Sequence, residues 1–532
     1  MVTGRDCVSS DAFVNKPCEY DGCGAGGDCD GCCGCASQER QGMTMLAMIG
    51  KIVLWILIVL AVLLVIAIIR ALLLKAPAKG QRMAVSRNEK ELQEMGERFA
   101  RMIRVETISK NGDEDLSAFD QLHDVIDDLF PLCTKTMEKN VVHGVLIYRW
   151  KGKDSSALPI LMMGHQDVVP VDPSGWKYPP FGGEIHDGAL YGRGTMDDKC
   201  NIFCQMSAIE GLLAKGFVPP CDVYLSYSIN EETSGNGAKE AIDWLKAHGV
   251  NRLALALDEG GAVVDKAMAG MDRPYAVIGI TEKGYVNLKV TASGEGGHAS
   301  APKAETPVTR LCEFVSDVNR KQPFERVMTP HVQSMFEGMA PSFDFGMKLL
   351  MGNLWLFRPL LVKLMPKVNN QAGALLGTTC AFTMMKGSDA ANVIPSHASM
   401  VANLRTGFTQ NVEESVNVLK KIGAKYDLEF EVLYSREASP VTPTDSAAYK
   451  YLEGCIRHQF PDCGVAPYVM TGGTDNRWYA ELTENCLRFY PVRLTSEELS
   501  CMHGNNERIS LDACSDAIDF YAYFLEHYQP GK

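Results

Sequence analysis

The sequence predicts an α/β protein: a mostly parallel sheet with helices on both faces, an inserted α+β domain and an N-terminal transmembrane helix. Three observations predict it. From about residue 88, short apolar runs alternate with amphipathic stretches, two runs of period two interrupt this pattern, and one long apolar run precedes it. Alternating strands and helices are typical of βαβ units, whereas period two indicates half-exposed antiparallel strands. With 532 residues, more than one domain is expected.

The N-terminal region combines an apolar run with a cysteine-rich segment. Residues 52–69 are all apolar, which is long enough to cross a bilayer, so a transmembrane helix is predicted over 51–75. Residues 1–50 are rich in Gly and Asp, and they hold seven of the 18 cysteines. Such a segment cannot bury a core and is predicted to be disordered. A metal-binding knuckle and lipidated cysteines are the alternatives.

The charges around the apolar run predict its orientation. Six basic residues lie in 70–90, against Arg40 and Lys51 on the other side, so the positive-inside rule places the C-terminal domain in the cytoplasm. The absence of Asn-x-Ser/Thr sequons and the scattered later cysteines agree with this. An outward-facing anchor remains the alternative. The net charge of -13 argues against a nucleic-acid partner.

The predicted catalytic domain begins at residue 88. Its first part, 88–281, contains three runs that read as buried strands, LPILMMG, VYLSYSI and LALAL. Between and after them, NIFCQMSAIEGLLAKG and AKEAIDWLKAHG read as amphipathic helices that end at glycine. The domain therefore has the strand–helix rhythm of a parallel sheet.

A second domain is predicted as an insertion over 282–406, after which the catalytic domain resumes over 407–530. GYVNLKVTASG and ASMVANLRTGF alternate with period two near its two ends. Between them, MKLLMGNLWLFRPLLVKLM is apolar enough to be either an exposed hydrophobic or lipid-facing surface or a buried interdomain helix.

Histidines and acidic residues collect at the ends of the predicted strands. They are His165 and Asp167 after LPILMMG, Asp197 and Asp198 in GRGTMDDK, Glu231 and Glu232 after VYLSYSIN, Asp258 and Glu259 after LALAL, and His503 in MHGNNE. Functional groups of open α/β sheets gather at the carboxyl ends of strands. Imidazole and carboxylate are ligands for zinc, and this set is large enough for two ions with a position left for water. The sequence thus predicts a hydrolytic two-zinc site.

Individual roles follow from this chemistry. Asp167 can accept a hydrogen bond from His165 and fix the tautomer of its ring. One carboxylate of GRGTMDDK can bridge both ions. Of the adjacent acids Glu231 and Glu232, one can bind zinc while the other serves as general base.

The chain resembles the aminoacylase/carboxypeptidase family of di-zinc exopeptidases, peptidase family M20. Within it, the chain is most similar to the carboxypeptidase S and N-fatty-acyl-amino-acid hydrolase branch. The resemblance spans about residues 90–530 and rests on GHQDVVPVD, WKYPPFGGEI, LYGRGTMDDK, NEETSG, LDEGG, GHASAP, NVIP, GGTDNR and MHGNNE, with NLWLFRP supporting the narrower branch.

The resemblance implies a role for each site residue. His165 and Asp258 would hold one zinc, Glu232 and His503 the other, and Asp197 would bridge them; Glu259 is the alternative to Asp258. Glu231 would be the general base, and a cis peptide would follow Asp197. His298, often reaching the site of a dimer partner, would stabilise the oxyanion. Asn392 and Arg405 would hold the substrate's carbonyl and terminal carboxylate. The Gly472–Gly473–Thr474 turn could supply backbone donors beside them; a plain tight turn is the alternative.

The predicted function is therefore a membrane-anchored di-zinc metallopeptidase or amidohydrolase. It would cleave an amide next to a free α-carboxylate by zinc-hydroxide attack, in N-acyl amino acids or at the carboxyl end of short peptides. Cobalt or manganese could replace zinc. The inserted domain would act as lid and homodimer interface. A catalytically dead peptidase-fold receptor or scaffold is the alternative function.

Overall fold

The computed structural model describes residues 33–110, 115–265 and 267–531. Its first helix, α1 (Cys33–Leu73), contains a stretch, Met45–Leu73, that is long and apolar enough to cross a membrane. This helix is either a signal sequence or a membrane anchor. The sequence predicts disorder for residues 1–50. Residues 1–32 of that segment lie outside the described residues. Residues 33–50 are helical rather than disordered, because the apolar pattern of the span continues N-terminally into 45–49.

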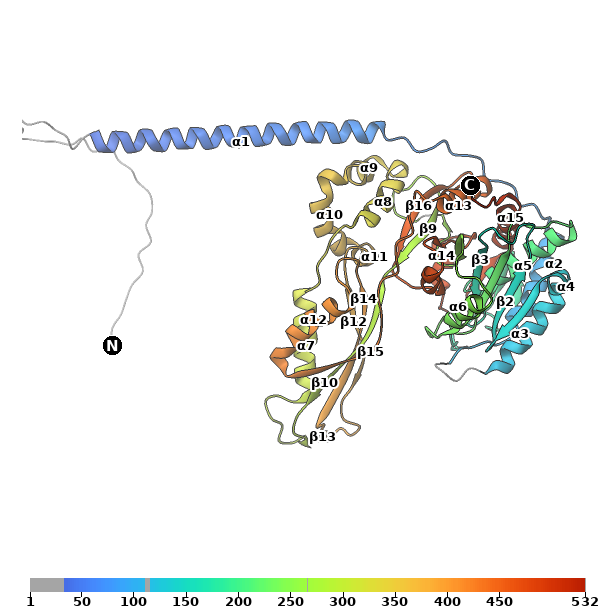
Figure 1. The fold of residues 1–532 in the computed structure, drawn as a ribbon. Helices are drawn as coiled ribbons and strands as arrows, with labels where there is room; N and C mark the ends of the chain where they lie inside the picture. Colours follow the sequence, from blue (N-terminus) through green and yellow to red (C-terminus); the bar gives the residue numbers. More distant parts are fainter. Residues whose placement is uncertain (1–32, 111–114, 266, 532) are drawn as a thin grey trace, which may run out of the picture. The chain divides into compact units, whose positions relative to one another are not determined.

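The larger sheet of the remaining chain has ten strands and mixed directions (Figure 1). The strands are β1 (Glu138–Val142), β2 (Val145–Trp150), β3 (Ile160–His165), β6 (Val223–Ser228), β7 (Leu255–Asp258), β8 (Val263–Val264), β9 (Tyr275–Glu282), β16 (Gly464–Met470), β17 (Cys486–Arg488) and β18 (Arg493–Leu494). Their order is β1-β2-β6-β3-β7-β17-β9-β8-β18, with β16 on β9.

The central strands β6, β3, β7 and β17 run parallel, as predicted, but their neighbours do not. β1 and β2 form an antiparallel hairpin whose two turn residues, His143 and Gly144, both have positive φ. This is the geometry of a tight hairpin turn. β9 is antiparallel to β17 and β8. The sheet is therefore mixed rather than mostly parallel.

Helices cover both faces of this sheet. Along β2, Leu146 and Tyr148 point into one hydrophobic cluster, and Val145 and Ile147 into another. The first cluster is built with α2 (Glu89–Ile103), α4 (Pro131–Thr136), α5 (Lys199–Ala214), α13 (Ala447–Gln459) and α15 (Leu511–His527). The second uses α6 (Gly237–Ala247) and the 3-10 helix η3 (Asp475–Glu481), while α3 (Leu116–Leu129) contributes to both.

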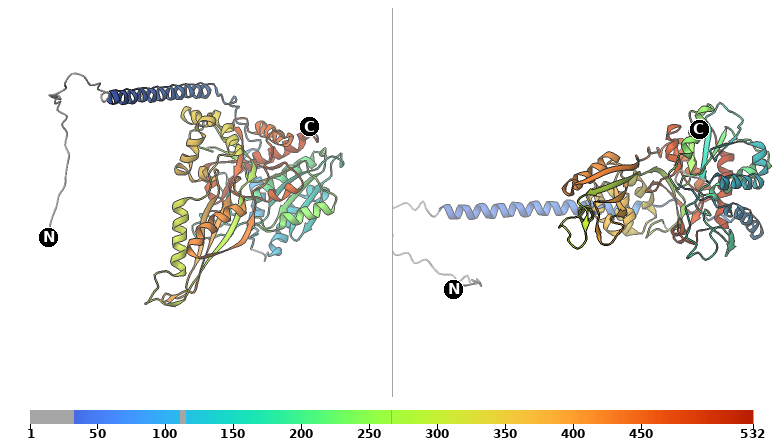
Figure 2. Two further views of the ribbon diagram at one scale, coloured as in Figure 1. Left: turned by 60° about the vertical axis from the view of Figure 1, so that its left-hand side comes forward. Right: turned by 90° about the horizontal axis from the view of Figure 1, so that it is seen from below.

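A separate antiparallel sheet has the order β12-β14-β10-β15 (Figures 1 and 2). Its strands are β12 (Thr379–Lys386), β14 (His397–Thr406), β10 (Gly284–Ser293) and β15 (Leu428–Arg436). Buried residues alternate along β10 and β14 and pack on α7 (Pro307–Lys321) and α12 (Val412–Gly423). The predicted boundary at residue 406 therefore falls too early, because β15 pairs with β10 and α12 packs on the same core.

The apolar stretch between the two alternating runs forms helices with one buried and one exposed side. α8 (Pro330–Met339), α9 (Phe345–Met351), α10 (Leu354–Val368) and α11 (Asn370–Ala374) follow one another, with η1 (Ala340–Ser342) after α8. Leu354 and Leu361 are buried in a cluster with Tyr275 of the larger sheet. Trp355 and Leu364 are exposed. The predicted buried helix therefore describes one side of α10, and the predicted exposed hydrophobic surface describes the other.

The two sheets are joined by a nearly continuous pair of strands. β9 ends at Glu282 and β10 begins at Gly284, so Lys283 alone separates them. The ammonium of Lys283 donates to the carbonyls of Ala374 and Gly377 at 2.8 and 2.6 Å.

The remaining elements are β4 (Glu184–His186), β5 (Ala189–Tyr191) and β19 (Arg508–Ser510) in a small sheet, β11 (Gly297–His298) paired with β13 (Val393–Ile394), η2 (Ala424–Tyr426) and α14 (Ser496–Cys501).

Candidate metal centre

Two groups of metal-ligand type share one carboxylate, that of Asp197. One group is His165, Asp197 and Glu259, and the other is Asp197, Glu232 and His503. The ring nitrogen Nε2 of His165 lies 2.8 Å from Oδ1 of Asp197, and Nε2 of His503 lies 3.0 Å from its Oδ2. Each oxygen of Asp197 thus faces a different histidine, which is the arrangement that a carboxylate bridging two metal ions requires.

The outer acids complete the two groups. Oε1 of Glu232 is 3.1 Å from His503 Nε2, and Oε1 of Glu259 is 3.5 Å from His165 Nε2. Asp258 is not in this group, because its Oδ2 accepts the backbone N–H of Asn476 at 3.0 Å. The geometry therefore favours Glu259, the alternative, over Asp258, the residue preferred from the sequence.

The positions of these residues follow from the order of the strands. His165 ends β3, Glu231 and Glu232 follow β6, and Glu259 follows β7. The strands β6, β3 and β7 are parallel neighbours, so their carboxyl ends meet at one edge of the sheet. His503 completes the group from a loop and has a φ of 58°, a conformation that side chains other than glycine adopt rarely.

Asp167 holds three parts of the centre at once. Its carboxylate accepts the backbone N–H groups of Glu231 and Glu232 at 3.2 and 3.1 Å. Its carbonyl oxygen accepts from Nδ1 of His165 at 3.0 Å. With Nδ1 donating to this carbonyl, a neutral ring would present the lone pair of Nε2 toward Asp197, which is the tautomer that a metal ligand needs.

A second buried carboxylate, Glu507, supports the loop that presents Asp197. Its Oε1 accepts the backbone N–H groups of Gly194, Met196 and Asp197 at 3.1, 2.8 and 3.2 Å. Its Oε2 pairs with Arg193 at 2.5 Å. The peptide bond between Asp197 and Asp198 is cis, in agreement with the prediction.

The electrostatics of the centre fit a pair of cations. Burial raises the pKa of Asp198, Glu231 and Glu259 well above the usual range. Hydrogen bonds from the His503 ring to the carboxylates of Asp197 and Glu232 raise the pKa of His503 to about 10. A buried cluster of carboxylates is costly unless positive charge is placed inside it, so the donor set suits two divalent ions.

Glu231 stands beside the metal-ligand groups without belonging to either. Its Oε1 is 3.9 Å from Nη1 of Arg477, in the 3-10 helix that follows the Gly472–Gly473–Thr474 turn. The neighbouring Asp475 accepts a hydrogen bond from Ser228 at 2.5 Å. A buried carboxylate next to two metal sites is placed to take and return a proton.

Two predicted residues lie elsewhere in this subunit. His298, in β11, and Asn392, next to β13, are both exposed, and the carbonyl of Asn392 accepts from the N–H of Ala299. β13 lies at the end of the antiparallel sheet that points away from the larger sheet (Figures 1 and 2). The structure therefore does not bring His298 or Asn392 to the centre formed by the same chain.

The other predicted substrate residues lie near the junction of the two sheets. Arg405 places its guanidinium carbon 4.5 Å from the ring centroid of Tyr285. Thr474 donates to Glu282 at 3.0 Å, and the Gly473 backbone lies directly against Arg436. The sequence had marked the motifs GGTDNR and MHGNNE, but it gave no role to Asp475, Arg477 or Glu507.

Comparisons with known proteins agree with this fold. The model of Peptidase family M20/M25/M40 matches residues 161–527. N-fatty-acyl-amino acid synthase/hydrolase PM20D1 of Xenopus tropicalis is 35% identical over 445 residues, which cover 82% of this chain and 86% of the relative. Probable carboxypeptidase S-like 2 of Dictyostelium discoideum is 32% identical over 446 residues, with 82% and 85% covered.

A solved structure resembles the whole fold. The M20 family metallo-carboxypeptidase Sso-CP2 from Sulfolobus solfataricus superposes with a TM-score of 0.61 and 20% identity, over 81% of this chain and 98% of the other. The chain belongs to the M20 peptidase family, and it is a hydrolase of the zinc peptidase and amidohydrolase type. Within the family it lies in the PM20D1 and carboxypeptidase S-like branch. Members of the family typically bind two zinc ions.

Proposed function

We propose that this chain is a membrane-anchored two-zinc amidohydrolase. It would release an amino acid with a free α-carboxylate from an N-acyl amino acid or from the carboxyl end of a short peptide. The observation that carries the proposal is the pair of ligand groups sharing Asp197, with Glu231 beside them, outside both groups and 3.9 Å from Arg477. The relatives that carry N-fatty-acyl-amino acid and carboxypeptidase names support both substrate classes.

The metal ligands in this proposal are His165 and Glu259 for one zinc, Glu232 and His503 for the other, and Asp197 for both. Bound zinc would polarise the amide carbonyl and make a water molecule more acidic. Cobalt or manganese would suit the same donors.

The remaining steps are carried out by the protein's own side chains. Glu231 removes a proton from the attacking water and delivers it to the leaving nitrogen. Arg405 holds the α-carboxylate with its planar fork of donors. His298 and Asn392, which lie far from the centre of their own chain, would serve the centre of a partner subunit in a homodimer, and His298 would steady the oxyanion.

A hydrophobic acyl group is the proposed other half of the substrate. Trp355, Leu360, Leu364 and Val368 on α10 and Phe345 on α9 expose large apolar surfaces. Large apolar side chains exposed together on a surface mark sites that contact apolar partners or ligands. It supports a long-chain acyl amino acid over a polar dipeptide.

The proposal is tested by amino-acid release from the full chain in detergent micelles. Long-chain and short-chain N-acyl amino acids and dipeptides would be offered before chelation, after chelation, and after zinc is returned. We expect release that chelation abolishes and zinc restores. A zinc-loaded protein that releases nothing across the panel contradicts the proposal. A protein that neither binds zinc nor turns over substrate is the receptor or scaffold considered from the sequence.

We further propose that α1 stays attached and anchors the enzyme with its C-terminal region in the cytoplasm, because basic residues concentrate after the span. Protease added to sealed vesicles that expose the cytoplasmic face of the membrane should then digest the C-terminal region. A C-terminal region that is protected inside the vesicles would reverse the orientation, and a mature chain without α1 would make it a signal sequence.

A further inference from the structure

Two arginines flank one tyrosine on the open face of the antiparallel sheet. Tyr285 in β10 is directly opposite Arg405 in β14 and Arg436 in β15. Residues in such a row point to the same face of the sheet. The guanidinium carbons lie 4.5 and 5.7 Å from the centroid of the tyrosine ring. The sheet therefore offers two cations side by side, while Val286 and Leu404, next along the strands, are buried on the other face.

A third arginine, Arg477, belongs to the 3-10 helix η3 and lies near this row. The guanidinium of Arg436 lies so close to Gly473 that a Cβ there would meet its Nη2 at 2.1 Å. Gly473 leads into the 3-10 helix that carries Arg477, whose Nη1 is 3.9 Å from Glu231. The three guanidinium groups thus gather next to the proposed general base.

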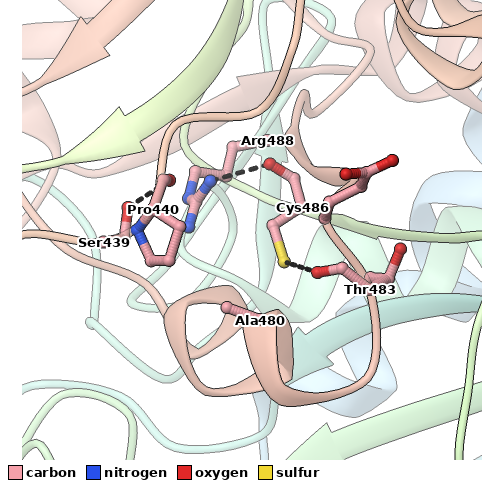
Figure 3. A pocket seen from close by; sticks show the side chains of 7 residues that line it. Ser439, Pro440, Ala480, Thr483, Cys486 and Arg488 are labelled. Atoms are coloured by element: carbon pink, nitrogen blue, oxygen red, sulfur yellow. Dashed lines mark hydrogen bonds between the residues drawn. The ribbon is translucent and has the colours of Figure 1, made fainter.

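The acids near these cations are shared: Glu231 and Asp475 act on Arg477, and Glu282 is shared by Arg436, Arg477 and Arg488. Glu282 is the nearest carboxylate to Arg436, at 3.5 Å, but its shorter contact of 2.5 Å is to Arg488. Figure 3 shows Arg488 in a small surface pocket, with its guanidinium also directed to the carbonyl of Cys486. Arg488 thus uses Nε and Nη1 within the fold, while its Nη2 has no hydrogen-bond partner in the described part of the chain, and Glu282 makes its shorter contact with Arg488.

Some donor atoms of Arg436 and Arg477 have no acceptor among the described residues. Within the described ranges, Nε of Arg436 and both Nε and Nη2 of Arg477 are buried and lack a hydrogen-bond partner. Buried donors without partners cost free energy, and an anion that meets them would recover it. Burial, with a smaller contribution from Arg477, lowers the pKa of Arg405 and Arg436, whereas, despite burial, Asp475, Glu282 and Glu231 raise the pKa of Arg477.

We propose that the enzyme is selective for N-acyl derivatives of aspartate or glutamate. Arg405 would bind the α-carboxylate, and Arg436, supported by Arg477, would bind the side-chain carboxylate. One carboxylate is satisfied by one guanidinium fork, so an α-carboxylate alone leaves Arg436 with only its 3.5 Å contact to Glu282, and its Nε without an acceptor in the part of the chain that the structure describes. This inference rests on the proposed function and names the amino acid that it releases.

The test compares isosteric substrates on the full, zinc-loaded chain. N-acyl-glutamate and N-acyl-glutamine differ by charge alone, and we expect kcat/KM to favour the glutamate compound by at least tenfold. Arg436→Met should reduce that ratio to near one, and Arg436→Lys should keep part of it. Arg405→Met should lower kcat/KM for both compounds together, because it removes the contact to the carboxylate that they share. Lys289 is a cation on the same sheet that pairs with Glu431. Lys289→Met should therefore leave the ratio of the two kcat/KM values unchanged.

Each outcome separates this inference from the proposed function. Hydrolysis of glutamine and glutamate compounds at equal rates overturns the second anion subsite but leaves the amidohydrolase intact, and it would make Arg436 a structural partner of Glu282. Preference for N-succinyl-leucine over N-acetyl-leucine, without preference for glutamate, places the second carboxylate in the acyl group and also overturns the inference. If no N-acyl amino acid is cleaved, the proposed function itself fails.

Binding gives a readout that does not depend on turnover or on a variant's folding. N-acetyl-glutamate and N-acetyl-glutamine would be titrated into Glu231→Gln protein by calorimetry. We expect at least tenfold tighter binding of the glutamate compound, weakening as salt is added. Equal affinities would overturn the inference even if every Arg436 variant failed to fold.

Discussion

Glu231→Gln should reduce kcat by about a thousandfold, because a general base in the proton-transfer step contributes about 10²–10⁴ to the rate. The amide has nearly the same shape as the carboxylate but cannot accept the proton. Glu231 belongs to neither ligand group, so the zinc content should stay near two per chain. Metal analysis and steady-state kinetics on the same preparation check both parts.

Two further variants make the Glu231 result specific. Glu231→Asp keeps a carboxylate at a shorter reach and should retain intermediate activity. Glu413→Gln, an exposed glutamate on α12, should leave kcat unchanged. If Glu231→Gln kept near-native kcat, or lost zinc in proportion to activity, Glu231 would not be the base.

Glu507→Ala should destabilise the catalytic domain by about 3–5 kcal/mol, because it leaves Arg193 buried without its anion. Three backbone N–H groups of the loop before and at Asp197 would lose their acceptor as well. For a domain of this size, a loss of this magnitude corresponds to a fall in Tm of roughly 10 °C. Zinc affinity should fall too, because the loop that presents the shared carboxylate is no longer held.

The surface pair of Glu497 and Arg508 provides the matched control. Glu497 is 79% exposed, so Glu497→Ala should cost less than about 1 kcal/mol. Thermal unfolding of the two variants, with and without zinc, separates the effects. Equal Tm values for Glu507→Ala and wild type would show that Arg193 finds another partner and that the Asp197 loop does not depend on Glu507.

The sequence was most informative where local pattern decides structure. The apolar runs that form β3, β6 and β7 are short and continuous, so both their strand state and the chemistry at their carboxyl ends could be predicted. The region 428–436 also alternates, LEFEVLYSR, and this pattern could have extended the inserted domain to β15. The antiparallel neighbours of the larger sheet depend on which strands meet in space, and no local pattern encodes that.

The choice between Asp258 and Glu259 shows where sequence reasoning stops. Successive residues of a strand point to opposite faces, so the ligand depends on the residue at which β7 ends. β7 ends at Asp258, whose carboxylate turns to the N–H of Asn476, and Glu259 is the first residue free to turn toward His165. Glu507 lay inside a recognised motif, but its role depends on contacts with residues more than 300 positions earlier.

The distance along the chain between the members of the centre bears on how the protein is made. Glu232 and His503 are 271 residues apart, and Arg193 and Glu507 are 314 apart. During synthesis, the second group of metal-ligand type and the support of the Asp197 loop therefore cannot form until residues 503 and 507 have left the ribosome. Full assembly of the centre would thus report that translation has passed Glu507, and a chain truncated before His503 would hold only the group of His165, Asp197 and Glu259.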